Sequence, residues 1–200
     1  MEKANMLDGS LYVEFGAGRA GLSSYVSSGC QNKHAVFLAI DRDSRRFKLD
    51  KEIKANGFDS IREKMDIADF DLVKWLSLRP ATAGVIGIAK HLCGGATDLS
   101  LTAFEHLEKG HVTGLSIATC CHHSCDTKTY VALPFISKCL PQLCGPEAKV
   151  CPIAFQKFVR CSSWAVCPQV ATRKRAAGFK VKRLIDLGRL LYIREVFQLK

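Results

Sequence analysis

Short apolar runs alternate with amphipathic or charged segments from the start of the chain up to Thr119. Apolar runs predict strands at about Leu11–Phe15, His34–Ile40 and Ala83–Ala89, and two further strands are predicted at about Ser60–Asp66 and His111–Thr119. The segments between them predict helices at about Ala20–Ser28, Asp43–Asn56, Phe70–Leu78 and Thr97–Leu107. Gly57 is expected at the C-terminal cap of the second helix, and Pro80 is expected to end the third.

This repeated order of strand and helix is typical of an α/β fold, in which a mostly parallel sheet carries helices on both faces. Right-handed crossovers bring the carboxyl ends of all strands to one edge of the sheet. We therefore expect the ligand site at that edge, near the switch point beside the first strand. Residues 126–168 show no clean periodicity. Arg173–Phe197 predicts one long helix with a weak point at Gly178 or Gly188.

The composition is that of a globular protein, with 48% hydrophobic and 24% charged residues in a chain of 200. This length suits a single domain spanning residues 1–200. The longest apolar run, near Gly84–Ala89, is too short to cross a membrane, and the first ten residues lack the apolar region of a secretory signal. We therefore expect an intracellular protein of the nucleus or cytoplasm, whose ten cysteines are reduced rather than paired in a disulfide framework.

The segment Leu11–Leu22, LYVEFGAGRAGL, predicts a strand that runs into a glycine-rich turn and then a helix. Gly16, Gly18 and Gly21 allow the backbone to turn sharply and to pass close to a ligand. Their spacing also fits the GxGxxG fingerprint, so an NAD(P)-dependent oxidoreductase is one alternative and a ligand-free turn is another. Glu14 favours a cationic ligand, such as the amino group of S-adenosylmethionine, because a carboxylate repels a pyrophosphate at close range.

Acidic residues end the next two predicted strands. Asp41 is placed to accept hydrogen bonds from the ribose hydroxyls of an adenosine, as in dinucleotide and methyl-donor enzymes. Asp66 and the adjacent Ile67 lie where an adenine amino group would be read, although an N-cap role for Asp66 fits nearly as well. These residues and the glycine-rich turn form the predicted cofactor site.

Two polar segments follow apolar strands at the same predicted edge. The first, Lys90–Gly95 (KHLCGG), lacks the acidic or amide residue with paired prolines that enzymes methylating exocyclic amines commonly carry. Lys90 and His91 are candidate catalytic residues that would accept the proton of a hydroxyl group, with a snorkelling lysine and a capping histidine as the alternative. The second, Thr119–Cys125 (TCCHHSC), is expected to form a wall of the substrate pocket and contributes His123 as a third candidate catalytic residue.

The second segment also has the residue types of a zinc site. Its spacing is poor, because neighbouring residues on a strand point to opposite faces and CCHH cannot all converge on one ion. Cys121 and Cys125, with His122 or His123, would supply part of a site. Zinc is therefore not favoured, and the predicted site contains no metal.

The formal net charge of +10 is uneven, because nine basic residues stand against two acidic residues from Gln169 to Lys200. This excess predicts a polyanionic partner, most simply the phosphates of a nucleic acid, with a solvated helix face as the alternative. A recurrence every seven residues places three of these basic residues on one helix face: Arg175, Lys182 and Arg189. Six residues are predicted to bind RNA: Arg173, Lys174, Arg175, Lys182, Arg183 and Arg189.

Together these segments resemble one family. EFGAGRAGLS, AIDRDSRRFKLD, KHLCGGATDLSL, ATCCHHSCD, RCSSWA and RLIDLGRLLYIRE follow one another in the order found in the eukaryotic tRNA ribose 2′-O-methyltransferases that modify the fourth nucleotide of the acceptor stem. The resemblance implies a Rossmann-like class I methyltransferase fold, S-adenosyl-L-methionine as methyl donor and a tRNA 2′-hydroxyl as acceptor. It places the donor loop of that family on Glu14, Gly16, Ala17 and Gly18, with Asp41 at the ribose.

Members of that family normally carry zinc-finger elements before the catalytic domain and a final strand pair after the last helix. This sequence matches neither, so the final strand pair is expected to be missing and the fifth strand to keep an uncovered edge. A catalytically inactive tRNA-binding fragment is therefore an alternative to an active enzyme. The expected partner is the acceptor stem of tRNA, with no membrane and no protein partner.

Overall fold

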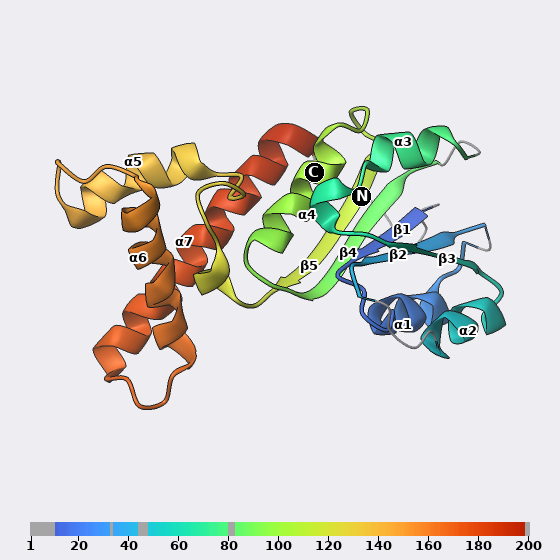
Figure 1. Cartoon of the computed structure of the whole chain (residues 1–200), viewed down its shortest axis with the longest axis horizontal. Helices are drawn as coiled ribbons and strands as arrows, with labels where there is room; N and C mark the ends of the chain where they lie inside the picture. Colours follow the sequence, from blue (N-terminus) through green and yellow to red (C-terminus); the bar gives the residue numbers. More distant parts are fainter. Residues whose placement is uncertain (1–10, 33, 44–47, 80–82, 199–200) are drawn as a thin grey trace, which may run out of the picture. The chain divides into compact units, whose positions relative to one another are not determined.

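The computed structural model describes residues 11–32, 34–43, 48–79 and 83–198. Five parallel strands form one sheet in the spatial order β3-β2-β1-β4-β5 (Figure 1). They are β1 (Leu11–Phe15), β2 (Val36–Asp41), β3 (Asp59–Lys64), β4 (Val85–Leu92) and β5 (Val112–Thr119). The chain order reverses at β1, which lies between β2 and β4, so the predicted switch point beside the first strand is confirmed.

All five predicted strands are present, and their ends differ from the prediction by a few residues. β4 shows the largest difference, because it continues to Leu92 instead of ending at Ala89. Lys90 and His91 are therefore the last polar residues of a strand and do not begin the turn that follows it.

Helices connect the strands in the predicted order. The first four are α1 (Gly21–Gly29), α2 (Lys48–Ala55), α3 (Leu72–Ser77) and α4 (Gly95–Glu105), with a 3₁₀ turn η1 (Ile67–Asp69) before α3. Gly57 ends α2 as expected, because it adopts a left-handed φ of 89° and donates its N–H to the Lys54 carbonyl at 2.9 Å. The predicted first residue, Asp43, is not helical, and residues 44–47 of the predicted helix and the Pro80 stop lie outside the described residues.

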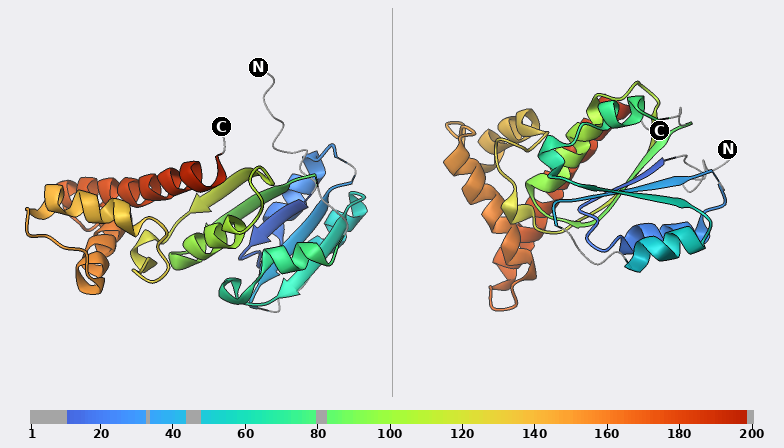
Figure 2. Two further views of the ribbon diagram at one scale, coloured as in Figure 1. Left: turned by 90° about the horizontal axis from the view of Figure 1, so that it is seen from above. Right: turned by 45° about the vertical axis from the view of Figure 1, so that its right-hand side comes forward.

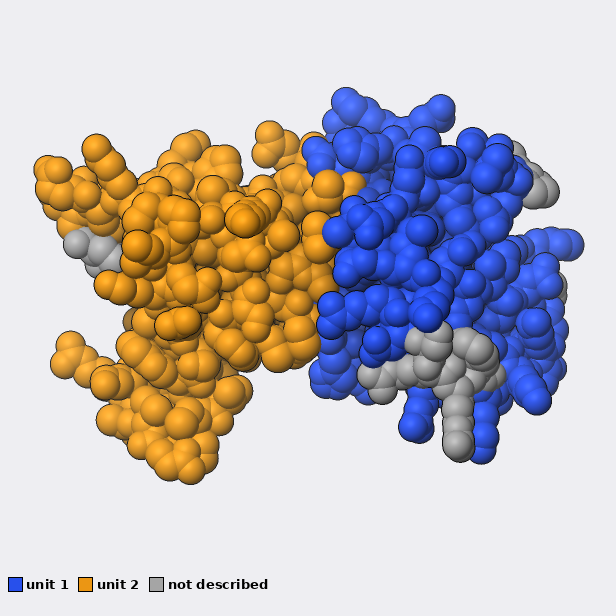
Figure 3. Space-filling view, in the orientation of Figure 1, with its two compact units in different colours: residues 1–92, 103–118, 197–200 blue, residues 93–102, 119–196 orange. Residues whose placement is uncertain are grey.

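The chain divides into two compact units, coloured separately in Figure 3. The first contains residues 1–92, 103–118 and 197–200, and the second contains residues 93–102 and 119–196. Each unit is described by itself below. The expectation that the whole chain folds as a single domain stays a prediction.

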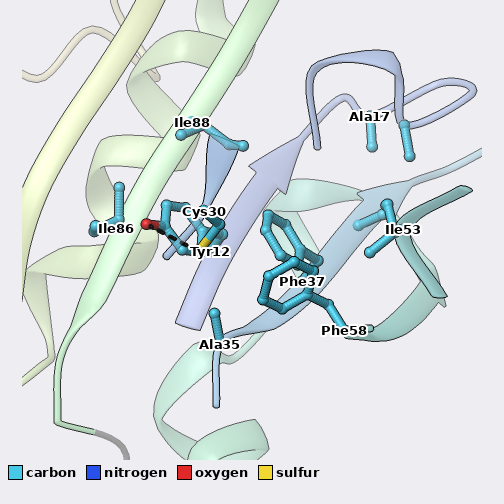
Figure 4. Packing of buried hydrophobic residues seen from close by; sticks show 11 residues of the cluster. Tyr12, Ala17, Cys30, Ala35, Phe37, Ile53, Phe58, Ile86 and Ile88 are labelled. Carbon is cyan, nitrogen blue, oxygen red and sulfur yellow. Dashed lines mark hydrogen bonds between the residues drawn. The ribbon is translucent and has the colours of Figure 1, made fainter. Parts of the chain in front are cut away.

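The first unit has apolar cores on both faces of the sheet. Tyr12 and Phe37 stack with ring centroids 4.9 Å apart on the face that carries α1 and α2 (Figures 2 and 4). On the opposite face Phe15 makes edge contacts with Phe70, which precedes α3, and with Phe104 of α4. This alternation along β1 follows from the two-residue period of a strand, and it confirms the prediction of helices on both faces of the sheet.

The second unit consists of helices around its own core. Its elements are residues 95–102 of α4, then η2 (His122–Ser124), α5 (Leu133–Cys144), α6 (Pro152–Arg160), η3 (Cys161–Val166) and α7 (Thr172–Phe197), whose last residue belongs to the first unit. Tyr130, Ile136, Phe155 and Ile185 are among its buried residues. No helix in the described residues has both the length and the apolar character needed to span a bilayer.

The single long helix predicted at Arg173–Phe197 is confirmed, and the weak point predicted at Gly178 or Gly188 produces no break in it. α7 continues through both glycines. The absence of a side chain at each glycine instead lets another group lie close to the helix. A Cβ added at Gly178 would lie 2.5 Å from the Ala165 nitrogen, and one added at Gly188 would collide with the Tyr130 hydroxyl. The two glycines serve close packing, and they do not mark a break.

Candidate functional site

The strand register of the first unit places three functional candidates at one level. Glu14 of β1 is paired with Ala39 of β2 on one side and with Ile88 of β4 on the other. Gly16, Asp41 and Lys90 each follow these paired residues by two positions. Gly16 comes directly after β1, Asp41 is the last residue of β2, and Lys90 lies two residues before the end of β4. This is the carboxyl edge at the switch point, where α/β sheets bind ligands.

The loop between β1 and α1 has the turn geometry that its glycines predict. Gly16, Gly18 and Ala20 adopt left-handed φ angles of 62°, 53° and 60°. A Cβ at Gly16 would lie 2.9 Å from Leu92 Cδ1, whereas a Cβ at Gly18 would have no atom within 4 Å. Gly16 therefore serves packing against the end of β4, and Gly18 leaves open space beside the loop.

Glu14 is 4% exposed and holds the start of α1. The backbone N–H and the hydroxyl of Ser23 both donate to its Oε2, at 2.9 Å and 2.5 Å. Burial raises the pKa of the Glu14 carboxyl, and the hydrogen bonds from Ser23 and the charge of Arg62 offset part of this increase. The carboxyl thus lies directly beneath the loop, on the sheet face covered by α1.

Asp41 is oriented by the backbone before any ligand is present. Its Oδ2 accepts the N–H of Gly18 at 2.7 Å, and its Oδ1 accepts the N–H of Asp43 at 2.8 Å. The Gly18 carbonyl in turn accepts from Arg62 Nη1 at 2.9 Å, and Arg62 pairs with both oxygens of Asp50 at 3.1 Å. These bonds link the glycine-rich loop to β2 and β3.

Asp66 takes the alternative role that the sequence allowed. It lies two residues beyond the end of β3, and its side chain caps η1 by accepting the N–H of Ala68 at 3.0 Å. Ile67 is the first residue of this turn and is half-buried. The N-cap role of Asp66 is confirmed, and adenine recognition by either residue stays a prediction.

Lys90 and His91 are exposed at the end of β4. His91 has a left-handed φ of 59°, which is uncommon for a residue with a Cβ and is a form of strain that clusters at functional sites. The exposure of Lys90 means that the described residues do not provide the desolvation on which its role as a base would depend. His123 lies in the second unit, where it is exposed in η2, and its carbonyl accepts from Gln156 Nε2 at 3.4 Å.

Three cysteines gather in the second unit, whereas the sequence predicted only that the run CCHH could not all converge on one ion. β5 ends at Thr119, so Cys120 and Cys121 lie beyond the strand and its alternation of faces does not apply. The Sγ atoms of Cys93 and Cys120 are 3.0 Å apart, and those of Cys120 and Cys121 are 3.7 Å apart. Hydrogen bonding with Cys120, together with partial burial, raises the pKa of the Cys93 thiol to about 12.

A buried polar cluster in the same unit was not found from the sequence. Arg189, which is 4% exposed, donates to Asp98 at 2.7 Å, to Asp186 at 3.2 Å and to the Cys125 sulfur at 3.1 Å. His122 Nε2 lies 2.7 Å from Asp186 Oδ2. Burial raises the pKa of Asp98, and Arg189 offsets part of that increase. The pKa of Asp186 is lowered, because its bonds to His122 and Arg189 outweigh the opposing effect of burial.

The predicted RNA-binding residues do not all share one exposed face. Arg173, Lys174, Arg175 and Arg183 of α7 are exposed, and Lys182 is half-buried. The prediction for Arg189 is corrected, because its guanidinium is buried in the cluster just described and is not presented to solvent. Trp164, the aromatic residue of RCSSWA, is half-buried, and the Lys174 ammonium lies 5.6 Å from its ring centroid.

The described residues therefore offer two kinds of chemistry. The first unit presents carboxylates, open loop space and two basic side chains at one strand edge, which suits a ligand with a cationic group and ribose hydroxyls. The second unit presents a cluster of thiols and an exposed basic helix start.

Comparison with known proteins identifies the family. The family model described as "Methyltransferase TRM13" matches residues 1–175. The chain is 42% identical over 139 residues to the "tRNA:m(4)X modification enzyme TRM13" of Schizosaccharomyces pombe, covering 64% of this chain and 37% of that protein. It is 30% identical over 213 residues to the human TRM13 homologue, covering 86% and 42%, and 29% identical over 256 residues to that of Dictyostelium discoideum, covering 100% and 46%.

The chain spans less than half the length of these three relatives. No solved structure matches it. The family model covers both the glycine-rich loop at the end of β1 and the polar segments that follow β4 and β5. On this match, the chain belongs to the TRM13 methyltransferase family.

Proposed function

We propose that this chain binds S-adenosylmethionine and transfers its methyl group to the ribose 2′-hydroxyl at the fourth nucleotide of a tRNA. The relatives described above are named as tRNA:m(4)X modification enzymes. The observation that carries the proposal is the common level of Gly16, Asp41 and Lys90 on three neighbouring strands at the switch point. The corresponding proposal for the sheet and its helices is a class I methyltransferase fold.

The donor is proposed to bind at the loop that follows β1. Glu14 places a buried carboxyl there, whose charged form is disfavoured by burial and stabilised by the hydrogen bonds from Ser23. Its cationic neighbour Arg62 is already paired with Asp50. A ligand with an amino group would compensate the Glu14 charge, whereas a pyrophosphate would be repelled. This preference distinguishes the donor from a dinucleotide.

The adenosine part of the donor is proposed to lie beside Asp41. Each oxygen of this carboxylate accepts one backbone N–H, and carboxylate oxygens have further lone pairs for ribose hydroxyls. The open space at Gly18 leaves room for the ribose next to the loop. Ala17, Asp66 and Ile67 complete the proposed site.

When bound, the donor supplies an electrophilic methyl group on a sulfonium, so the residues of the protein have to align the acceptor hydroxyl and accept its proton. His91 is the first candidate, because an imidazole exchanges protons near neutral pH and this one is exposed at the end of β4. Lys90 is the second candidate and would act once bound RNA excludes water from it. His123, the third candidate, belongs to the second unit, and its catalytic role stays a prediction from the sequence.

The tRNA is proposed to be held by the basic residues Arg173, Lys174, Arg175, Lys182 and Arg183 of α7. Phosphate contacts of this kind give affinity and position without reading the sequence. Trp164 lies beside Lys174 and would offer a ring face to an unpaired base.

The test is incubation of the full chain with labelled S-adenosylmethionine and unmodified tRNA, followed by mapping of the methylated ribose. We expect one labelled ribose, at the fourth nucleotide, and a large loss of rate in His91→Ala. The matched control is His106→Ala, which removes an exposed histidine outside the proposed site and should leave the rate unchanged. Full activity of both Lys90→Ala and His91→Ala would show that the proton assignment is wrong.

Two other functions have distinct outcomes in the same assays. A chain that binds tRNA at low salt but transfers no methyl group would be an RNA-binding module without catalysis. Calorimetry with S-adenosylmethionine and with NAD separates the methyl donor from a dinucleotide. Binding of NAD alone would replace the proposal with an oxidoreductase.

A further inference from the structure

Three cysteine thiols that the proposed reaction does not use lie together in the second unit. Cys93 follows β4, and Cys120 and Cys121 follow the neighbouring strand β5. Their sulfur atoms all lie within 4.8 Å of one another. We propose that Cys93, Cys120 and Cys121 bind one thiophilic divalent cation of the zinc type through three sulfur ligands.

The sulfur spacing suits a tetrahedral metal. With Zn–S bonds of about 2.3 Å, neighbouring sulfurs of a tetrahedral site lie about 3.8 Å apart. The distance between Cys120 Sγ and Cys121 Sγ is 3.7 Å. The distance between Cys93 Sγ and Cys120 Sγ is 3.0 Å, so this pair would widen by about 0.8 Å around a metal. Rotation about one Cα–Cβ bond accommodates such a change.

The backbone of the two contributing segments is held together by packing that does not involve the thiols. Gly94, next to Cys93, has a φ of 55°, and a Cβ placed on it would lie 2.6 Å from the Ser124 carbonyl oxygen. Arg189 Nη2 also donates to the Gly94 carbonyl at 3.2 Å. The turn that carries Cys93 is therefore fixed directly against the segment that follows Cys121.

A second set of contacts fixes Cys120. His122 Nδ1 lies 3.0 Å from the Cys120 carbonyl oxygen, and its Nε2 lies 2.7 Å from Asp186 Oδ2. Asp186 is in turn bonded to Arg189 at 3.2 Å. Outer contacts of this kind orient the ligands of metal sites, so the site is largely formed before an ion arrives.

The donor set selects the class of ion. Sulfur ligands favour zinc and other thiophilic metals over magnesium or calcium, which take oxygen ligands. Cys93 is exposed and the other two cysteines are half-buried, so the fourth position faces solvent and takes water or an added ligand. Cys125 lies outside the set, because its sulfur is buried and accepts from Arg189 Nη2 at 3.1 Å.

The test is metal binding by the full chain, purified in reductant and stripped of metal. Cobalt(II) and zinc are the probes. We expect one equivalent of cobalt to give a thiolate charge-transfer band with the visible bands of a tetrahedral ion, and zinc to displace it. Alkylation followed by mass spectrometry should show that zinc protects three thiols, those of Cys93, Cys120 and Cys121.

Serine variants locate the site. Each of Cys93→Ser, Cys120→Ser and Cys121→Ser should weaken cobalt binding at least tenfold. Cys151→Ser should leave binding unchanged, because this exposed cysteine caps α6 and lies outside the cluster. The proposal is overturned if no stoichiometric metal binds, if binding persists in Cys93→Ser, or if alkylation finds Cys93 and Cys120 in a disulfide. The protection experiment uses the unmodified chain, so it decides the matter even if a variant fails to fold.

Discussion

Arg189 and Asp98 form a buried ion pair that joins α7 to α4 within the second unit. Arg189 Nε donates to Asp98 Oδ1 at 3.0 Å, and Nη2 donates to Oδ2 at 2.7 Å. The Asp98 side chain has no exposed surface, and that of Arg189 is 5% exposed. Burial keeps the Asp98 carboxylate from solvent, so its charge depends on Arg189, whereas Arg189 also pairs with Asp186.

Removal of the Arg189 charge should therefore destabilise the protein strongly. Arg189→Met leaves the Asp98 carboxylate buried without its main partner, and we expect a loss of about 3–5 kcal/mol in the free energy of unfolding, measured by urea denaturation. Arg183→Met, on an exposed position of the same helix, should stay within about 0.5 kcal/mol of the wild type. The double variant Arg189→Met with Asp98→Leu should recover part of the loss. Equal stability of the two single variants would contradict a structural role for Arg189.

Gly94 should not tolerate a side chain. Its φ is 55°, and an added Cβ would meet the backbone carbonyl carbon of Ser124 at 2.7 Å, so the backbone has to move. Gly94→Ala should cost at least about 2–3 kcal/mol of unfolding free energy, combining left-handed strain with overpacking. Gly110→Ala is the matched control, since Gly110 has a φ of 83° and no atom within 4 Å of a Cβ. Gly110→Ala should cost only about 1–2 kcal/mol of unfolding free energy. A larger loss in Gly110→Ala than in Gly94→Ala would show that the close contact at Gly94 does not cause the destabilisation.

The stability of the protein should depend on pH through Glu14. Because burial raises the pKa of this carboxyl above its ordinary value of 4.5, the folded protein binds the proton more tightly than the unfolded chain. The unfolding free energy therefore falls as pH rises from 4.5 through the raised folded value, and Glu14→Gln should lack this decline. Between about pH 4 and pH 8, the melting temperature of Glu14→Gln should increase relative to that of the wild type as pH rises. Glu195→Gln, at an exposed glutamate, should follow the wild type at every pH.

The same substitution tests the donor site. If Glu14 compensates the amino group of the donor, Glu14→Gln should weaken S-adenosylmethionine binding in calorimetry while the fold stays intact. An unchanged dissociation constant would show that Glu14 has only a structural role, in which it binds Ser23 and holds the start of α1.

Salt should weaken tRNA binding in proportion to the phosphates that α7 neutralises. Removal of one phosphate-binding side chain should reduce the slope of log K against log salt by about 0.7–0.9. The double variant Arg173→Ala with Arg175→Ala should therefore lower the slope by about 1.4–1.8 in filter binding. Lys51→Ala with Lys54→Ala removes two exposed charges from α2 and serves as the control. Equal slopes for the two double variants would indicate nonspecific attraction rather than direct phosphate binding at α7.

β1, β2 and β4 were predictable because they are apolar runs, which a strand buried on both faces of a parallel sheet requires. β3 is polar and has no fully buried residue, so it carries a much weaker signal. The final residues of β4 were not predictable, since Lys90 and His91 are polar and exposed and carry no strand signal. α5 and α6 were missed for a different reason. Pro134 and Pro152 occupy first-turn positions, where proline starts a helix, yet in a sequence they suggest a break.

The site residues likewise divide into those that a local sequence pattern marks and those that it does not. The glycine-rich turn and Asp41 could be placed from local pattern, because strand ends and turn glycines have a fixed spacing. The burial of Arg189 could not, since a seven-residue recurrence of basic residues does not tell an exposed charge from a paired one. The apolar neighbours of Arg189 and its three-residue spacing from Asp186 were the available signal.

Asp41 has a consequence for ligand affinity. Its side chain is held by the Gly18 and Asp43 amides when the protein folds, so its rotamer freedom is lost at that stage rather than when a nucleoside arrives. If Asp41 binds the ribose of the donor as proposed, binding would need no conformational search at this position. A substitution that breaks the hydrogen bond from the Gly18 amide should then slow nucleoside binding even where the melting temperature is unchanged.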